Sequence, residues 1–155
     1  MTALKIDLVG DGAAIVTRHF AASPEQVFRA HVEAEYIRQW MGGMEGWDMT
    51  HCESDARAGG VLRYGWAGPD GMSFEITGEY EVVKPYSEIR HVERMHVPEA
   101  TPDNRCHTTF EAKEGGTLLT VRMQLPDEES LKAMLDTGME QGMEDSYGRI
   151  DGLFS

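Results

Sequence analysis

The sequence predicts an α+β fold in which a curved antiparallel sheet of about seven strands grips a long C-terminal helix. Two observations lead to this prediction. Residues 47–124 alternate apolar and polar side chains in short runs separated by turn signals, which is typical of antiparallel strands. Residues 127–152 instead carry apolar side chains at three- and four-residue spacing, the pattern of an amphipathic helix. Such a helix needs an apolar surface to cover, and one face of the sheet provides it.

One strand and two short helices precede the main run of strands. Residues 13–20 (AAIVTRHF) are rich in β-branched and apolar side chains and form the first predicted strand. Ser23 begins a capping-box pattern, with proline at the first helical position and glutamine at the third, so a helix is predicted to start there. A second short helix is predicted over 34–40, and Gly42 and Gly43 end it.

The strands that follow are delimited by their turns. The clearest strand, 72–83, alternates apolar residues with Ser, Thr and Glu, so one face is predicted to be buried and the other solvated. Residues 68–71 (GPDG) supply a turn before it, Pro85 stops it, and 114–116 (EGG) join two later strands as a hairpin. These breaks give about six consecutive antiparallel strands after the helix pair.

The stretch 55–60 (DARAGG) invites a chemical interpretation, since a glycine-rich loop can hold a phosphate on its backbone N–H groups. A phosphate loop opens a helix, however, and this stretch lies between two predicted antiparallel strands. We therefore predict a connection from a strand ending near Ser54 to one beginning near Val61. Its glycines permit positive φ, and Asp55 and Arg57 fix the turn by local polar contacts.

The last predicted element is one long helix from Asp127 to about Gly152, with acidic residues in its first turn that complement the helix dipole. Its apolar stripe comprises Leu131, Met134, Leu135, Met139, Gly142, Met143, Ser146, Tyr147, Ile150 and Leu153.

Earlier in the chain, the polar segment 95–105 is twice interrupted by proline. It is predicted to be a mobile loop, either an ordinary long hairpin connection or a functional lid.

Length and charge restrict the class of protein. The 155 residues match a single domain, 1–155, that is long enough to build its own core. The 27 acidic and 14 basic residues give a net charge of −13, which opposes binding to nucleic acid and to anionic membranes. No apolar run approaches the ~20 residues of a membrane span, and no signal peptide is recognisable, so a cytoplasmic protein is expected. Cys52 and Cys106 are then expected to be reduced, buried thiols.

The order of motifs along the chain resembles the helix-grip superfamily known as SRPBCC or START-like. Within it, the sequence is similar to a bacterial branch related to the C-terminal domain of the activator of the ninety-kilodalton heat-shock protein ATPase. The motifs that carry the resemblance are Arg18–Phe20, Ala22–Phe28, Trp40, Asp55–Gly60, Gly78–Tyr80, Thr137–Met143 and Ser146–Ile150. They span nearly the whole chain in the expected order.

The resemblance implies a cavity between the long helix and the concave sheet, where members of the wider superfamily bind apolar ligands. We therefore expect a small apolar molecule of the lipid, polyketide or aromatic class to bind there. The residues predicted to contact it are Trp40, Trp47, Tyr64, Trp66, Phe74, Tyr80, His91, Glu93, Met123, Met139, Met143 and Tyr147. The alternative is that these methionine and aromatic side chains simply fill the core.

Histidines and acidic residues offer a second kind of site. His91 and Glu93 share one face of a predicted strand and His107 lies on the next strand, so an acid–base pair or a metal site in the pocket is an alternative. The spacing matches no compact metal motif, and we predict no metal and no cofactor. His51 and Cys52 are adjacent on a strand and point to opposite faces, which disfavours a shared ion. No Gly-x-Ser-x-Gly elbow is present, and no catalytic residue is predicted.

Three functions follow from these expectations. The leading one is binding of a small apolar ligand, with little or no catalytic activity, by a monomer or homodimer. The second, implied by the resemblance, is a co-chaperone-like module of the stress response that contacts a chaperone or another protein. The third is a cyclase-type enzyme, similar to polyketide cyclases, that acts on a ligand in the same cavity with His91 and Glu93 as acid–base groups.

Overall fold

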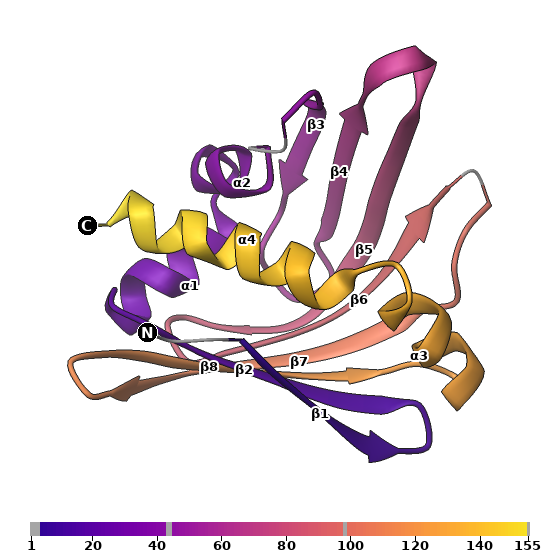
Figure 1. Ribbon diagram of the computed structural model, residues 1–155. Helices are drawn as coiled ribbons and strands as arrows, with labels where there is room; N and C mark the ends of the chain where they lie inside the picture. The colour runs from indigo at the N-terminus through magenta and orange to yellow at the C-terminus, as the bar shows by residue number, and fades with distance from the viewer. Residues whose placement is uncertain (1–3, 43–44, 98, 155) are drawn as a thin grey trace.

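The computed structural model describes residues 4–42, 45–97 and 99–154 (Figure 1). Within those ranges, eight strands form one antiparallel sheet in the order β1-β2-β8-β7-β6-β5-β4-β3. The strands are β1 Lys5–Gly10, β2 Ala13–Phe20, β3 Asp48–Ser54, β4 Val61–Ala67, β5 Ser73–Lys84, β6 Glu88–His96, β7 Asn104–Lys113 and β8 Gly116–Gln124. The helices are α1 Pro24–Val32, α2 Ala34–Met41, α3 Glu128–Leu135 and α4 Met139–Leu153, with a short 3-10 turn, η1, at Pro69–Gly71. The predicted α+β class is confirmed.

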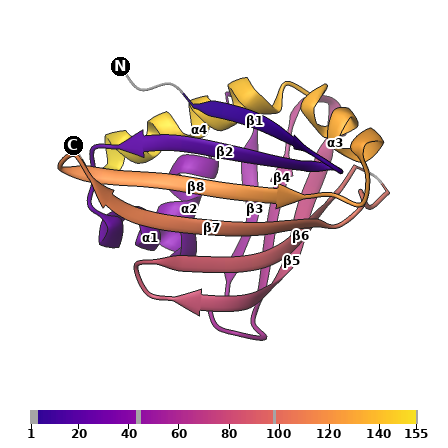
Figure 2. The same cartoon turned by 90° about the horizontal axis from the view of Figure 1, so that it is seen from below.

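The sheet is strongly curved, and α4 runs across its concave face (Figure 1). α1 and α2 pack together at one end of α4, and α3 lies at its other end beside β2. Seen from below, β1, β2, β8 and β7 run side by side while β3 and β4 cross behind them (Figure 2). Among the described residues, no helix has both the length and the apolar character to cross a membrane.

The core fills the space between the concave face and the helices. Its largest fully buried side chains come from both layers, and they include Phe20 on β2, Leu119 on β8, Ile37 on α2 and Ile150 on α4. Burial of each such side chain contributes about 1.5–3 kcal/mol to stability relative to an exposed position. The apolar stripe of the C-terminal segment therefore covers the sheet, as the sequence predicts.

The helix pair forms as predicted. At the start of α1, the Ser23 hydroxyl accepts a hydrogen bond from the Gln26 N–H at 3.2 Å, and the Gln26 side-chain oxygen accepts one from the Ser23 N–H at 3.0 Å. α2 begins at Ala34 and its C-cap is Gly42, while Gly43 lies outside the described residues. The six strands β3 to β8 then follow in sequence.

The strand count is eight instead of about seven, because β1 precedes the first predicted strand. β1 is an edge strand with no buried residue, so its sequence lacks the clear alternation of a half-buried strand. It turns into β2 through Gly10, Asp11 and Gly12, whose φ values are 90°, 56° and 81°. The helix pair consequently follows the second strand and not the first.

The C-terminal segment forms two helices where one was predicted over 127–152. α3 ends at Leu135 and α4 begins at Met139, and Gly138 between them has a φ of 85°. This backbone conformation favours glycine and interrupts the helix. The first turn of α3 is capped by the Asp127 carboxylate, which accepts a hydrogen bond from the Ser130 N–H at 2.8 Å. The break lets α3 lie against β2 while α4 crosses the sheet.

The stretch 55–60 connects β3 and β4, as predicted. The Arg57 Nε donates to both carboxylate oxygens of Asp55 at 2.9 Å. Gly59 has a φ of 85°, but Gly60 does not adopt positive φ. Glycine is required at position 60 for another reason, since a Cβ there would collide with the Asp55 carbonyl oxygen. The prediction of positive φ is therefore right for Gly59 and wrong for Gly60.

The two flanking strands take up both ends of the segment 95–105. β6 continues to His96 and β7 begins at Asn104, so the connection is shorter than predicted. The Thr101 hydroxyl accepts a hydrogen bond from the Met95 N–H at 2.9 Å, and the Thr101 N–H donates to the Met95 carbonyl at 2.8 Å. Residue 98 lies outside the described residues. These contacts define a hairpin connection, and its mobility stays a prediction.

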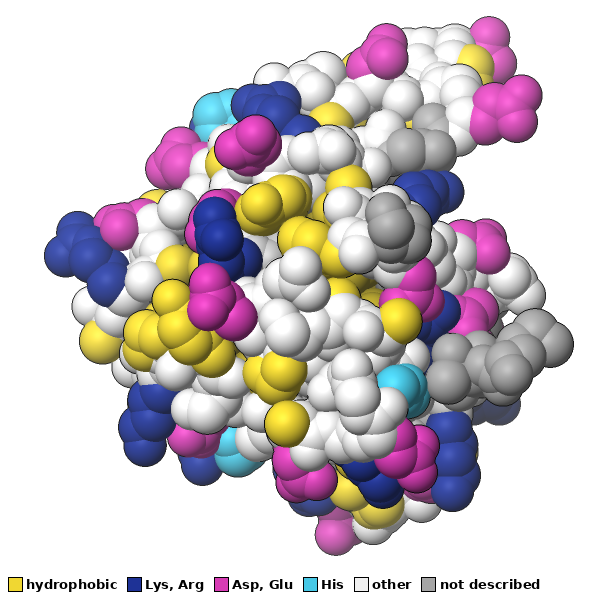
Figure 3. Space-filling view, turned by 90° about the vertical axis from the view of Figure 1, so that its left-hand side faces the viewer, with side chains coloured by type: hydrophobic (Ala, Val, Ile, Leu, Met, Phe, Trp, Pro, Cys, Tyr) yellow, Lys and Arg dark blue, Asp and Glu magenta, His cyan; other side chains and the backbone are white. Residues whose placement is uncertain are grey.

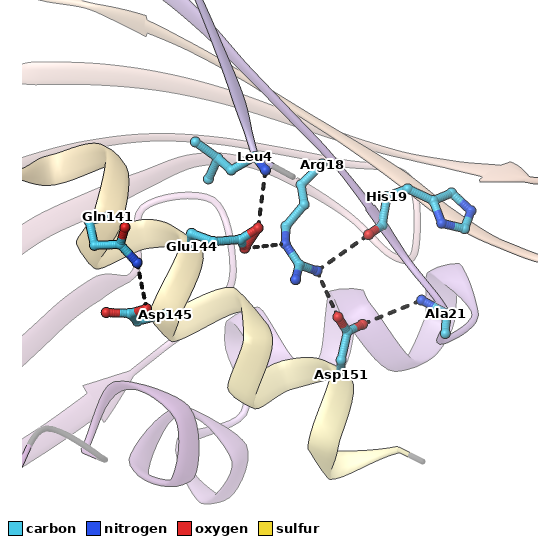
Figure 4. Close-up of polar contacts among 8 residues, drawn as sticks. All are labelled: Leu4, Arg18, His19, Ala21, Gln141, Glu144, Asp145 and Asp151. Carbon is cyan, nitrogen blue, oxygen red and sulfur yellow. Dashed lines mark hydrogen bonds and ion pairs between the residues drawn. The ribbon is translucent and has the colours of Figure 1, made fainter. Parts of the chain in front are cut away.

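A charged network fastens α4 to β2 (Figure 4). The Arg18 side chain, only 5% exposed, donates from Nε to Glu144 at 2.9 Å and from Nη1 to Asp151 at 2.8 Å. The same two carboxylates accept backbone N–H groups of Leu4 at 3.1 Å and Ala21 at 3.4 Å. Two carboxylates two turns apart on α4 thus bind Arg18 of β2 and the backbone next to β1 and β2. These contacts fix the position of α4 on the sheet.

Candidate functional site

A pocket of about 420 Å³ lies between α4 and the concave face of the sheet. Inward-facing side chains of β4 to β8 form its floor, α4 forms its roof, and α1 and α2 close one end. Most of the lining is apolar, and small-molecule sites of proteins commonly enclose about 300–1,000 Å³. The pocket therefore has the size and character of a site for a small organic molecule.

Eleven of the twelve side chains predicted to contact a ligand line this pocket. They are Trp40, Tyr64, Trp66, Phe74, Tyr80, His91, Glu93, Met123, Met139, Met143 and Tyr147. Trp47 is not part of the lining. Its ring packs edge-on against the lining residue Phe74, with ring centroids 5.3 Å apart. Contact of the eleven with a ligand stays a prediction.

The alternation of side chains along β4 and β5 brings aromatic rings to the pocket face of the sheet. Residues at every second position of a strand share a face, and Tyr64 and Trp66 on β4 are both buried. The cross-strand partner of Trp66 is Phe74 on β5, and the two rings stack with centroids 4.6 Å apart and planes 14° apart. This pairing gives the pocket a flat aromatic surface.

The polar atoms of the indole rings are already satisfied by the backbone. The Trp40 Nε1 donates to the Ala30 carbonyl at 2.7 Å, and the Trp66 Nε1 donates to the Met41 carbonyl at 3.0 Å. Buried tryptophan normally finds such a partner, and the bond fixes the ring. Both tryptophans therefore present only apolar ring surface to the pocket.

Methionine makes up much of the remaining wall. The methionines in the lining are Met41, Met95, Met123, Met134, Met139 and Met143. Their unbranched thioether side chains adapt to ligands of different shape. Gly142 of α4 also lines the pocket, and a Cβ added there would meet no atom within 4 Å. The roof of the pocket thus combines flexible side chains with open space.

One part of the pocket is polar. On β6, the His91 Nε2 lies 2.7 Å from a carboxylate oxygen of Glu93, and the two side chains are 16% and 32% exposed. Across the strands, Cys106 of β7 pairs with His91 and Asn104 pairs with Glu93. Burial raises the pKa of the Cys106 thiol well above its usual value, and the nearby Glu93 adds to this effect. Four side chains that bear polar or ionisable atoms therefore meet on the concave face.

The predicted place of His107 beside this pair is wrong. The His107 Nε2 lies 2.6 Å from a carboxylate oxygen of Glu88. Adjacent residues of a strand point to opposite faces, so Cys106, which lines the pocket, sends His107 to the convex side.

His51 and Cys52 do point to opposite faces, as predicted. His51 is bonded to Glu53 at 3.2 Å on the exposed side, and Cys52 packs against the core. Cys52 and Cys106 are both free thiols. Cys106 is buried, as expected, whereas the expectation is wrong for Cys52, which is only partly buried. Burial also raises the pKa of Cys52.

His31 is a pocket residue that the sequence pattern did not single out. It lies on α1, and its ring contacts the rings of Trp40 and Phe110, each with centroids 5.3 Å apart. Burial lowers the pKa of His31 to about 4, so the ring is neutral near pH 7, and its Nδ1 lies 2.7 Å from the Val27 carbonyl. The signal that could have found it is its spacing, four residues after Val27 on the apolar face of the predicted helix.

Three buried side-chain polar atoms in the described part of the chain have no hydrogen-bond partner. They are His31 Nε2, His91 Nδ1 and Asn104 Oδ1. All three residues line the pocket. Buried polar atoms are normally paired, so these three are polar atoms of the pocket lining that remain available for a hydrogen bond.

The antiparallel sheet curved around a long C-terminal helix, with a helix pair between its second and third strands, defines the helix-grip class of the START-like superfamily. A sequence model of the family described as "Activator of Hsp90 ATPase homolog 1-like protein" matches residues 21–155. The chain therefore belongs to this family, and the predicted resemblance is confirmed. No curated protein matches the sequence.

Solved bacterial structures share the fold over almost their whole length. A protein from Rhodobacter sphaeroides is 27% identical, with 97% of both chains covered and a TM-score of 0.87. A protein from Mycobacterium smegmatis is 22% identical, with 100% of this chain and 98% of that chain covered and a TM-score of 0.86. A solution structure from Staphylococcus epidermidis is 24% identical over 96% of this chain and 92% of that chain, with a TM-score of 0.81.

Proposed function

We propose that this protein binds a small apolar molecule in the pocket between α4 and the sheet. The observation that supports the proposal is the pocket itself, about 420 Å³ with a lining dominated by aromatic and methionine side chains. The pocket is partly open to solvent, and a ligand that fills it would remove its apolar lining from water. The lipid, polyketide and aromatic classes all provide an apolar body of suitable chemistry.

His31 supports a more specific ligand. Because the Val27 carbonyl can only accept, the neutral ring must carry its proton on Nδ1, and Nε2 is left as an unpaired acceptor. A ligand hydroxyl or N–H group would supply the missing donor. We therefore favour an apolar molecule that carries one hydroxyl group, such as a phenol or a long-chain alcohol, over a pure hydrocarbon.

A matched pair of glycine substitutions tests the proposal. Gly142 and Gly148 both lie in α4, and a Cβ added at either would meet open space, but only Gly142 lines the pocket. The neutral probe N-phenylnaphthylamine, whose fluorescence rises in apolar surroundings, is expected to bind the natural protein and Gly148→Phe. Gly142→Phe is expected to bind it about tenfold or more weakly, because the added ring occupies the pocket. Equal binding by both variants would place the probe elsewhere.

A second candidate function rests on the family. Its description names an activator of the Hsp90 ATPase, which supports a co-chaperone-like role through the protein surface. The chain carries a net charge of −13. The face in Figure 3 shows acidic and basic side chains around several hydrophobic clusters, so a partner there would meet a mixed charged and apolar surface. This role predicts faster ATP hydrolysis by purified Hsp90 when the protein is added, and an equal effect of Gly142→Phe. No change in ATP hydrolysis would exclude it.

A further inference from the structure

Three side chains with metal-binding atoms meet on the floor of the pocket. His91 and Glu93 lie two residues apart on β6 and share a face, and Cys106 on β7 is the cross-strand partner of His91. One ligand atom from each lies within 4.8 Å of the other two. We propose that these three side chains bind one zinc ion, with the fourth coordination position open to the pocket.

A tetrahedral ion requires only a small change in the spacing of the His91 and Glu93 ligand atoms. With metal–ligand bonds of about 2.0–2.3 Å, neighbouring ligands of a tetrahedral zinc site lie roughly 3.3–3.8 Å apart. The His91 Nε2 and the Glu93 oxygen are now 2.7 Å apart, a hydrogen-bond distance. When the ion binds Nε2, the proton between the two atoms moves to His91 Nδ1, which has no hydrogen-bond partner, so the ring stays neutral. The two ligand atoms separate by about 1 Å or less, which side-chain rotation can provide.

The ligand types select the kind of ion. A thiolate, an imidazole and a carboxylate together favour Zn²⁺ over Mg²⁺ or Ca²⁺, which prefer oxygen ligands throughout. Binding releases the Cys106 proton to solvent, and the thiolate and the Glu93 carboxylate then carry two negative charges. A divalent cation leaves the cluster neutral, so no net charge is buried among the apolar side chains of the pocket.

Asn104 gives an independent indication of an occupant. It is 7% exposed, lies directly across from Glu93 and lines the same pocket, and its Oδ1 has no hydrogen-bond partner. Its amide nitrogen is directed to the Met134 sulfur at 4.0 Å. A three-ligand zinc site holds water or a substrate atom in its fourth position. The Oδ1 is the acceptor that a water molecule on the ion would use.

Cobalt(II) is the probe for this site, because its spectrum reports both geometry and sulfur ligation. In the reduced, metal-free protein, one equivalent of Co²⁺ is expected to produce intense visible bands of a four-coordinate ion and a sulfur-to-cobalt charge-transfer band. One equivalent of Zn²⁺ is expected to remove both. Cys106→Ser should lose the charge-transfer band. Glu93→Gln should weaken the affinity for Co²⁺ by ~10-fold or more. Loss of a residue that only hydrogen-bonds to a metal ligand already has an effect of this size, and Glu93 is proposed to be a ligand itself.

The chain offers two matched controls. Cys52→Ser removes the other free thiol, and His107→Asn removes a carboxylate-bonded histidine from the convex face. Both are expected to keep the natural spectrum and stoichiometry. The proposal is overturned if the folded natural protein gives no charge-transfer band, if the band survives Cys106→Ser, or if Cys52→Ser abolishes it. Circular dichroism of each variant verifies folding.

The zinc proposal does not depend on the proposed apolar ligand. The metal-free natural protein is expected to bind N-phenylnaphthylamine, because the aromatic and methionine side chains of the pocket are in place without the ion. Gly142→Phe is expected to bind Co²⁺ normally, since the ligand atoms lie on β6 and β7 and the added ring lies on α4. Each proposal can therefore fail while the other stands.

Discussion

Acidification is expected to destabilise this protein through His31. The ring lies on α1 beside the rings of Phe110 and Tyr147, and its Nε2 is buried. Burial lowers its pKa from 6.5 to about 4, the hydrogen bond to Val27 partly opposes this, and the proximity of His91 lowers the pKa further. In the unfolded chain His31 regains an ordinary pKa, so folding and protonation of this ring compete.

The sign and size of the effect follow from the two pKa values. Between pH 6.5 and about 4 the unfolded chain binds a proton at His31 and the native protein does not, so stability falls as pH falls through this window. Above it the contribution of His31 is constant. A pKa difference of about 2.5 corresponds to about 3 kcal/mol at full effect. Most of this, about 2 kcal/mol, is lost between about pH 7 and pH 4.5.

His31→Phe removes the titration and keeps an aromatic ring in place. Urea unfolding of both proteins, in buffer with a chelator, gives the free energy of unfolding at each pH. The natural protein is expected to lose about 2 kcal/mol more than His31→Phe over this range, because contributions from the carboxylates are common to both. Equal losses in the two proteins would show that His31 is not held neutral by burial.

Two further predictions concern the placement of α4. Arg18→Met is expected to cost about 2 kcal/mol, less than the 3–5 typical of a fully buried pair because its two carboxylate partners stay about one-third exposed. Lys5→Met, at an exposed ion pair, should change stability by less than about 0.5 kcal/mol; similar urea midpoints for the two variants would contradict this. Alanine at Gly138, with a φ of 85°, should cost about 1 kcal/mol, whereas alanine at helical Gly142 should stabilise by about 0.5–1 kcal/mol. Thermal shifts of the same sign would refute that reasoning.

Much of the fold could be predicted because its signals are local. The capping box at Ser23 and the turn at 68–71 depend on neighbouring residues only, and both lie where expected. β1 could not be predicted, since an exposed edge strand has no buried face to impose alternation. The break at Gly138 could not be predicted because a helical stripe continues through it, and only the backbone conformation reveals it.

The site was predictable where it follows alternation along a strand. Tyr64 and Trp66, or His91 and Glu93, share a face because they are two residues apart. Which residue of β7 stands opposite His91 depends on strand register, and that register brings Cys106 inward in place of His107. Strand register is set by contacts between segments that are distant in the sequence, so residue spacing within one strand cannot predict it.

Methionine methyl resonances test the central claim most directly. With carbon-13 methyl methionine, addition of N-phenylnaphthylamine is expected to shift the signals of the six methionines that line the pocket. These are Met41, Met95, Met123, Met134, Met139 and Met143. Met72 is 49% exposed and lies outside the pocket, so its signal is expected to stay in place. Binding that shifts Met72 and leaves the pocket methionines unchanged would contradict a ligand site between α4 and the sheet.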